Sequence, residues 1–364
     1  EGGSASFVSP DGLIITNQHV AAGQLAKLSN KDRDLIKDGF YARTQAEELK
    51  TTDAEAFVLM SFENVTERVQ SAVKTGATDR EAAEQRRAAI AAIEKESSEK
   101  TGFRSDVISF YNGGEYWLYR FKRYSDIRLV FAPEEKIAAF GGDYDNFTFP
   151  RHNLDVTFFR VYENGVPAKT PNFLKWSETG ATDGEFVIAA GNPGSTARLL
   201  TVAQLKYQRD FGNPLQKQIW ETLLGAYQNY AKGGAEQARQ AGGAMRSLNN
   251  SLKRLTGQQT GLLNPRLFAR KETEEKDLKE GLAKNPALEK EYAPAWVQIE
   301  KSYADLPPMA KRLAFSNVSV SRQASIASSL VRYSEEIQKP NEKRYPEFGD
   351  ARLERFKASL LSPA

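Results

Sequence analysis

The first residue that could do chemistry in this chain is a histidine that directly follows a β-hairpin pattern. Two short apolar stretches, Phe7-Val8 and Leu13-Ile14-Ile15, flank Pro10-Asp11-Gly12, which is typical of two strands joined by a tight turn. His19 follows where the second stretch ends. An imidazole held there by rigid backbone, yet facing a cleft, could act as a general base. A surface histidine after a hairpin fits the same pattern, and the hairpin alone leaves both interpretations open.

A second group of polar residues fills the stretch from Phe140 to Asp155. Paired glycines, aspartates and asparagines favour tight turns there, and Pro150 ends any strand. Such a loop is costly to order unless its polar groups find partners, so we interpret it as a binding loop on a rigid scaffold. A polar corner between strands is the alternative. Asp155 opens the apolar strand that follows, where a carboxylate could orient an imidazole, although a residue that merely caps the strand also fits.

Composition limits what else the chain can do. Its 364 residues favour two domains, and a net charge of +3 without a long basic stripe argues against nucleic acid. No cysteine is present, which excludes disulfides and thiolate catalysis, and the apolar runs are too short to cross a bilayer. The only two histidines are His19 and His152, which argues against a His-rich metal site, and we expect no metal and no cofactor. Because both ends look cut, we expect a piece of a longer protein.

The elements that would position these residues change in type near residue 200. Up to about residue 189, short aromatic and β-branched stretches punctuated by Gly, Asn and Asp predict an antiparallel barrel or sandwich. Strands are expected at 55–60, 107–111, 116–121, 127–131, 155–162 and 185–189, and an exposed, inserted helix at 79–95. Helical spacing follows at 201–211, 214–231, 235–255, 272–282, 286–305 and 308–333. We therefore predict a β domain over residues 1–200 and an α-helical domain over 201–364.

Two long motifs, in the order His then Asp, together resemble one known family. The run from Gly2 to His19 and the run Gly141 to His152, followed by Asp155, are similar to the bacterial dipeptidyl peptidase 7/11 family of serine peptidases. The resemblance implies a chymotrypsin-like β-barrel, here incomplete, with a helical domain that caps the cleft. It also implies release of dipeptides from free peptide N-termini, in the periplasm or at the cell surface of a Gram-negative bacterium, and a homodimer as an option.

Matched position by position, the resemblance assigns roles to individual residues. His19 corresponds to the family's general base and Asp155 to its orienting carboxylate. Asn146, and Asn250 in the stretch Leu248–Lys253, correspond to amides that hold the ammonium group of the substrate. Phe147 stands where the family usually has Trp at that subsite. Oriented amide oxygens can accept hydrogen bonds from an ammonium group, which makes the assignment chemically consistent.

The departures from the family pattern concern a disulfide and the nucleophile. Gly3 and Val20 stand where the family has cysteines, which implies that one family disulfide is missing here. The family's serine lies in a Gly-Asn-Ser-Gly-Ser-Pro run, and no such run occurs in this chain. Ser195, in Gly191–Thr196, is an alternative nucleophile that corresponds better to a structural turn of the family. We therefore expect the isolated chain to be inactive.

Three hypotheses of function follow. The first is the N-terminal portion of a serine dipeptidyl peptidase that acts on peptides with free N-termini. The second is a non-catalytic relative that binds peptide N-termini. The third is an unrelated β-barrel with a helical appendage, which would leave both motifs as coincidence.

Overall fold

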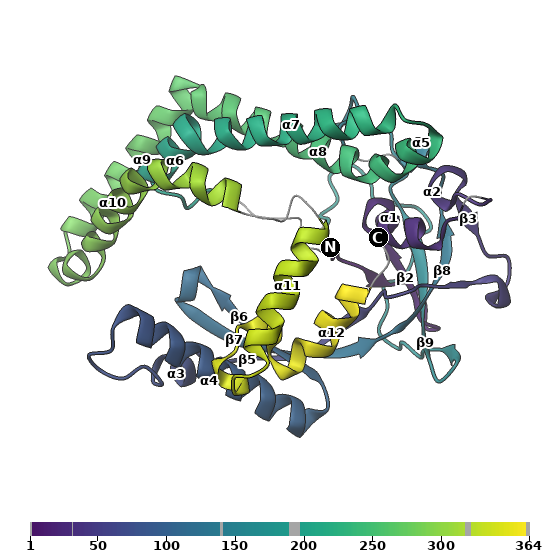
Figure 1. Ribbon diagram of the computed structural model, residues 1–364, viewed down its shortest axis with the longest axis horizontal. Coiled ribbons are helices and arrows are strands. Elements are labelled where there is room, and N and C mark those ends of the chain that lie inside the picture. Colours follow the sequence, from purple (N-terminus) through teal and green to yellow (C-terminus); the bar gives the residue numbers. More distant parts are fainter. Residues whose placement is uncertain (1, 31, 139–140, 189–196, 317–321, 362–364) are drawn as a thin grey trace.

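The computed structural model describes residues 2–30, 32–138, 141–188, 197–316 and 322–361 (Figure 1). The predicted hairpin is confirmed: β1 (Ser6–Phe7) pairs antiparallel with β2 (Leu13–Thr16). It opens a seven-stranded antiparallel sheet in which β2 lies beside β9 (Thr157–Glu163) and β9 beside β8 (Asp126–Ala132). Three two-residue strands complete its margins: β3 (Phe40–Tyr41) and β4 (Leu49–Lys50) pair with β8, and β10 (Val166–Pro167) pairs with β9.

A hydrophobic core holds α1 (Gln18–Leu28) and α2 (Leu35–Asp38) against this sheet. Leu25 and Leu35 from the helices and Leu129 and Val161 from the strands are all essentially inaccessible to solvent. Burying a leucine or valine side chain contributes about 1.5–3 kcal/mol, so this cluster holds α1 and α2 against the sheet. The short helix α5 (Glu135–Ala138) precedes the loop that returns the chain to β9.

A second, three-stranded antiparallel sheet has the order β5 (Ala56–Asn64), β7 (Glu115–Tyr124), β6 (Arg104–Phe110). Helix α3 (Thr66–Gln70) and the long helix α4 (Asp79–Thr101) pack on it. The start of α4 is as the sequence predicts, because Thr78 and Glu81 form a reciprocal capping box. The prediction of an exposed insertion is wrong for one face of α4, since Ile93 is buried with Val65, Val69 and Leu118.

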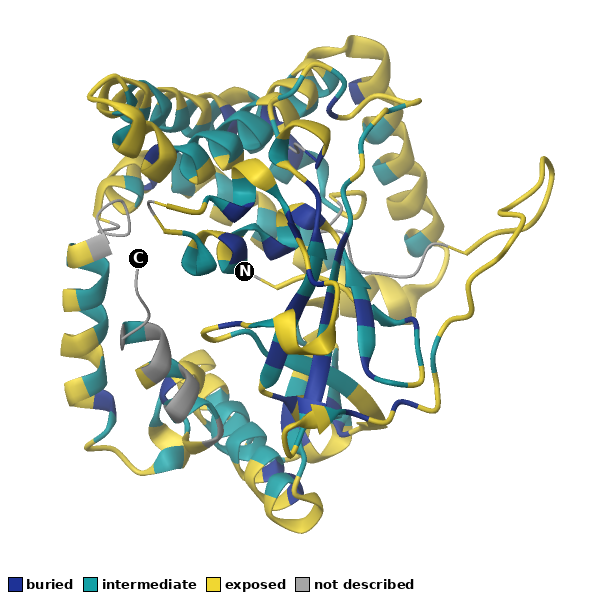
Figure 2. Ribbon diagram, turned by 90° about the vertical axis from the view of Figure 1, so that its right-hand side faces the viewer, coloured by how far each residue is buried: buried dark blue, intermediate teal, exposed yellow. Residues whose placement is uncertain are grey.

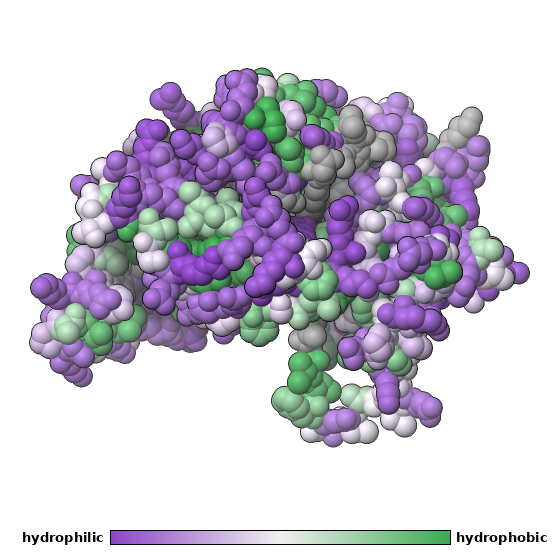
Figure 3. Space-filling model, turned by 90° about the horizontal axis from the view of Figure 1, so that it is seen from below, coloured by the Kyte–Doolittle hydropathy of each residue, from purple (hydrophilic) through white to green (hydrophobic). Residues whose placement is uncertain are grey.

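Two further predictions about the β region can be compared with the structure. The resemblance implies an incomplete barrel, and within the described residues neither sheet closes into a barrel, because each strand path ends in unpaired edges. The strand predicted over 185–189 is wrong for its described part: residues 185–188 pair with no strand, and Phe186 and Ile188 are 86% and 79% exposed. They belong to an extension, residues 171–188, that projects from the molecule in Figure 2 and carries hydrophobic side chains in Figure 3. A β-type sequence forms a strand only where a neighbour satisfies its backbone.

From residue 202 onward the described chain is helical, as the spacing predicts. Helices α6 (Val202–Tyr207), α7 (Asn213–Ala231), α8 (Ala235–Leu263), α9 (Pro265–Ala283) and α10 (Pro286–Ser316) form one layer, with α7 alongside α8 (Figure 1). The break expected near residue 306 is wrong, because α10 continues through Pro307 and Pro308. Helices α11 (Arg322–Glu336) and α12 (Asp350–Leu361) then lead back toward α4. Within the described ranges, no helix combines the length and apolar character that a membrane crossing requires.

Candidate active site

The strand register brings the two residues that the sequence singles out into contact. Strands β2 and β9 run antiparallel with Thr16 opposite Thr157. The residues that follow β2 therefore lie beside the residues that precede β9, which places Asn17–His19 next to Asp155. A separation of 136 positions in the sequence is thus closed by one antiparallel ladder.

The contact between His19 and Asp155 is a short hydrogen bond. Nδ1 of His19 lies 2.6 Å from Oδ2 of Asp155, and the backbone N–H of His19 donates to Oδ1 of the same carboxylate at 3.0 Å. The His19 side chain is 39% exposed and that of Asp155 only 13%. The carboxylate is therefore held inside while the imidazole reaches the surface. A proton on Nδ1 leaves the lone pair on Nε2, which is the tautomer that a general base needs.

The environment of Asp155 favours its charged form. Burial raises the pKa of this carboxyl, but hydrogen bonds from the His19 ring, the His19 backbone and the Asn17 amide outweigh it, and the pKa lies below its ordinary value. The group is therefore ionised at neutral pH. A fixed negative charge beside Nδ1 can stabilise the imidazolium that forms when Nε2 takes up a proton.

The loop between residues 141 and 155 is docked on helix α8. Gly141 and Gly142 both have positive φ, and a Cβ at Gly142 would overlap the side chain of Asn249, so only glycine allows this approach. Lys253 of α8 donates from Nζ to the carbonyl oxygens of Asp143 and Tyr144, each at 3.0 Å. The helical layer therefore holds the same loop that ends at Asp155.

The two asparagines that the sequence singles out also meet. Nδ2 of Asn146 donates to Oδ1 of Asn250 at 2.9 Å, across 104 residues of sequence. Arg151 donates from Nη1 to Oδ1 of Asn146 at 3.2 Å and forms an ion pair with Asp143 at 2.6 Å. Asn146 is 1% exposed, whereas its neighbour Phe147 has a positive φ and is 58% exposed. The loop thus turns an amide inward and an aromatic ring outward at adjacent positions.

Sequence reasoning missed two contributors to this arrangement. Asn17 donates to Asp155, and its only sequence signal is its position in the Thr16–His19 run, one residue before a helix. Lys253 anchors the loop, but a lysine on a helix carries no local signal of a tertiary partner. His152 is exposed and does not pair with Asp155 in any contact that the described residues show. Ser195 lies outside the described residues.

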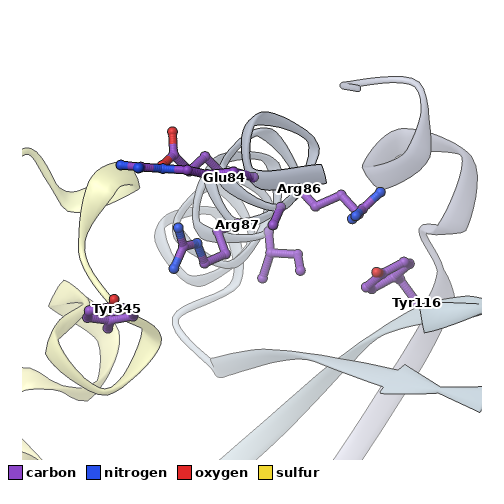
Figure 4. A pocket seen from close by; sticks show the side chains of 8 residues that line it. Glu84, Arg86, Arg87, Tyr116 and Tyr345 are labelled. Atoms are coloured by element: carbon purple, nitrogen blue, oxygen red, sulfur yellow. The ribbon is translucent and has the colours of Figure 1, made fainter. Parts of the chain in front are cut away.

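A cavity of about 480 Å³ lies elsewhere, between α4 and the segment around Tyr345 (Figure 4). Arg86 points toward Tyr116, whereas Arg87 lies over the Tyr345 ring at 5.3 Å, so the two guanidinium groups do not converge. None of its lining residues belongs to the His19–Asp155 or Asn146–Asn250 pairs. Across the part of the chain that the structure describes, no three His, Asp or Glu side chains are grouped so as to hold a metal ion.

Comparison with known proteins gives a consistent result. The family model for peptidase S46 matches residues 1–364. The chain is 28% identical to an Asp/Glu-specific dipeptidyl-peptidase of Shewanella putrefaciens over 98% of this chain and 50% of the relative. It is 34% identical to a dipeptidyl-peptidase 7 of Phocaeicola vulgatus over 56% of this chain and 31% of that relative.

The fold agrees as well. The crystal structure of Porphyromonas endodontalis DPP11 in complex with the dipeptide Arg-Glu superposes with a TM-score of 0.75 at 22% identity, over 99% of this chain and 54% of that one. The chain therefore spans about half the length of the relatives that it matches over nearly its whole length. Since the family model covers the whole chain, the chain belongs to the peptidase S46 family.

Proposed function

We propose that this chain is the part of a serine-type dipeptidyl aminopeptidase that supplies the general base and binds the peptide N-terminus. The observation that carries the proposal is the 2.6 Å bond between His19 Nδ1 and Asp155 Oδ2. In the proposed reaction, His19 Nε2 takes the proton of an attacking serine and later gives it to the leaving amine. Asp155 keeps the imidazole oriented and stabilises its charged form.

The Asn146–Asn250 pair is the proposed site for the substrate ammonium group. Each amide oxygen accepts one hydrogen bond in the structure and has a second lone pair for an N–H of the ammonium group. Because Asn146 is 1% exposed, we expect Asn250, on the helical layer, to contact the ammonium directly and Asn146 to hold it in place. Phe147 would contact the first side chains of the peptide. An ammonium site at a fixed distance from the base limits cleavage to short N-terminal fragments.

The finer features of the family are part of the same proposal. Residues 1–200 would form part of a chymotrypsin-like β domain and residues 201–364 a helical domain capping the cleft, in support of which the helical layer contacts the 141–155 loop. The nucleophilic serine is assigned to no residue of this chain. We also propose a periplasmic or cell-surface location and leave a homodimer as part of the hypothesis, both by analogy with the family.

Binding of peptides to the 364-residue chain tests the ammonium site. We expect a tetrapeptide with a free N-terminus to bind at least tenfold more tightly than its N-acetylated form, because a lost charge-assisted hydrogen bond costs about 1.5–3 kcal/mol. Asn250→Ala should remove that difference, whereas Asn249→Ala, one position along the same helix, should keep it. Equal affinities for the free and acetylated peptides would contradict the proposal.

Hydrolysis tests the base. In the protein that carries this chain together with its serine, His19→Ala should abolish release of dipeptidyl chromophores, and His152→Ala should not. Peptide binding without turnover in that protein, and no covalent labelling by a serine-directed phosphonofluoridate, would favour the non-catalytic relative instead.

A further inference from the structure

Asn17 occupies a helix-capping position without capping the helix. It is the N-cap residue of α1 by backbone conformation, with φ −79° and ψ 149°, but its side chain makes no bond to the first turn. An asparagine at an N-cap ordinarily accepts a hydrogen bond from the second or third helical N–H. Here Nδ2 donates away from the helix, to Oδ2 and to the backbone oxygen of Asp155, both at 3.1 Å.

Asp155 takes over the capping role that Asn17 leaves. Its Oδ1 accepts the backbone N–H of His19, the second residue of α1, at 3.0 Å. Its Oδ2 is shared by two donors, the His19 ring and the Asn17 amide. The negative charge also lies at the positive end of the helix dipole, which favours it. All of these donors come from two residues, Asn17 and His19.

We propose that Asn17 is a positioning residue for His19, acting through Asp155. The inference rests on the proposed function of His19 as a base. With Asn17 in place, neither carboxylate oxygen can turn away from α1 without losing a donor. The second bond, to the Asp155 backbone oxygen, fixes the chain just before β9 as well. Without the amide, rotation of the carboxylate is opposed by His19 alone, and the ring loses its single preferred orientation.

Asn17→Asp separates this role from ordinary capping. Aspartate has the same shape and is as good an N-cap as asparagine, so a capping role predicts a tolerated change. A positioning role predicts the opposite, because an acceptor would replace the donor and place a second carboxylate about 3 Å from Asp155. The matched control is Asn264→Asp. Asn264 is the N-cap of α9, and its oxygen accepts from the backbone N–H groups of Arg266 and Leu267, as a capping residue should.

The measurement is the ring tautomer of His19 by NMR in the 364-residue chain labelled at histidine. The chain has only two histidines, so His152→Ala assigns the spectrum. We expect the wild type and Asn264→Asp to show His19 with its proton on Nδ1 and a protected Nδ1–H signal. Asn17→Asp should lose that signal and show a mixture of tautomers. Asn17→Ser, a neutral cap that is too short to span the same distance, should show the same loss if the aspartate variant does not fold.

An unchanged His19 tautomer and N–H signal in a folded Asn17 variant would overturn the inference. Because the measurement needs no turnover, it is independent of the proposed function. A lost signal in Asn17→Asp, together with absence of peptidase activity in the complete protein, would leave the positioning role in place and remove only the catalytic one.

Discussion

Cysteines at positions 3 and 20 should form a disulfide that ties the segment before β1 to helix α1. A Cβ atom on Gly3 would lie 3.2 Å from Cβ of Val20 and 2.6 Å from each of its two methyl carbons. Disulfides need Cβ atoms about 3.5–4.5 Å apart. A shift of a few tenths of an ångström is therefore enough once the methyl groups are replaced by one sulfur. Gly3 does not have a positive φ, so a cysteine can adopt its backbone conformation.

The size of the effect follows from the loop that the bond closes. About 17 residues separate the two positions, and closing a loop of that length stabilises the folded chain by about 3 kcal/mol in the chain-entropy description. The closed loop includes the hairpin and His19. The chain has no other cysteine, so no competing disulfide can form.

The assay compares the oxidised and reduced forms of the Gly3→Cys/Val20→Cys variant by denaturant unfolding at 25 °C, after thiol titration has verified the bond. Each single variant serves as a control, and Gly3→Cys alone should be destabilised because its side chain meets the Val20 methyl groups. Two thiols that stay titratable after oxidation with glutathione would contradict the predicted bond. Oxidised and reduced forms that unfold at the same denaturant concentration would contradict the predicted stabilisation.

Three further changes test other parts of the structure. Glu48→Ala should lower the free energy of unfolding by about 3–5 kcal/mol, because it leaves the mostly buried Arg160 without its carboxylate partner at 2.9 Å. Denaturant unfolding measures this loss, and a loss below about 1 kcal/mol would contradict the prediction. Burial and the hydrogen bond to Glu48 raise the pKa of Tyr162 to about 12 from 10, so the contribution of the neutral hydroxyl to folding stability is complete below pH 10 and is lost as pH rises through 12. Between these pH values the free energy of unfolding of the wild type should therefore fall about 2–3 kcal/mol more than that of Tyr162→Phe. Parallel pH dependences of the two proteins in denaturant unfolding would contradict this prediction. Gly142→Ala should lower the melting temperature of the chain more than Gly165→Ala does. Both glycines have φ +79°, but a Cβ at Gly142 would overlap Asn249, whereas a Cβ at Gly165 would meet nothing. Equal melting temperatures of the two variants would contradict the close approach of Gly142 to α8.

Local sequence patterns were sufficient to predict the structure of segments whose stabilising contacts lie within the segment itself. The hairpin turn lies entirely within residues 6–16, and the α4 start depends on Thr78 and Glu81 alone. The helical layer likewise follows from spacing within each helix. In each case the stabilising partner is only a few positions away, so no knowledge of the fold is needed.

Prediction failed where the partner is distant. Residues 185–188 have the composition of a strand, yet in the described chain no strand lies beside them to accept their hydrogen bonds. Conversely, Pro307 and Pro308 suggest a helix break, but α10 runs through both, and Ala310 beyond them is buried. Composition states a preference, and tertiary contacts decide whether that preference is realised.

The candidate site was predictable in its residues but not in its geometry. His19 and Asp155 could be identified as candidates from the sequence, because one follows an apolar stretch and the other precedes one. The register of β2 on β9 that brings them together cannot be derived from either strand alone. The role of Asn17 could not be predicted from the sequence either, because its residue type and position fit an ordinary helix N-cap. Only the position of Asp155 shows that its amide donates instead of accepting.

One loop joins the two halves of the candidate site. At one end Asn146 is bonded to Asn250 on the helical layer, and at the other Asp155 is bonded to His19 on the sheet. These anchors lie nine positions apart in the sequence, and Arg151 between them is bonded to Asn146 and Asp143. Because residues 146–155 are bonded at both ends and in the middle, a displacement of one end should also move the other. Any movement of α8 relative to the sheet should therefore alter the Asn146–Asn250 pair and the orientation of Asp155 together, which under the proposed function would couple recognition of the peptide N-terminus to the alignment of the base.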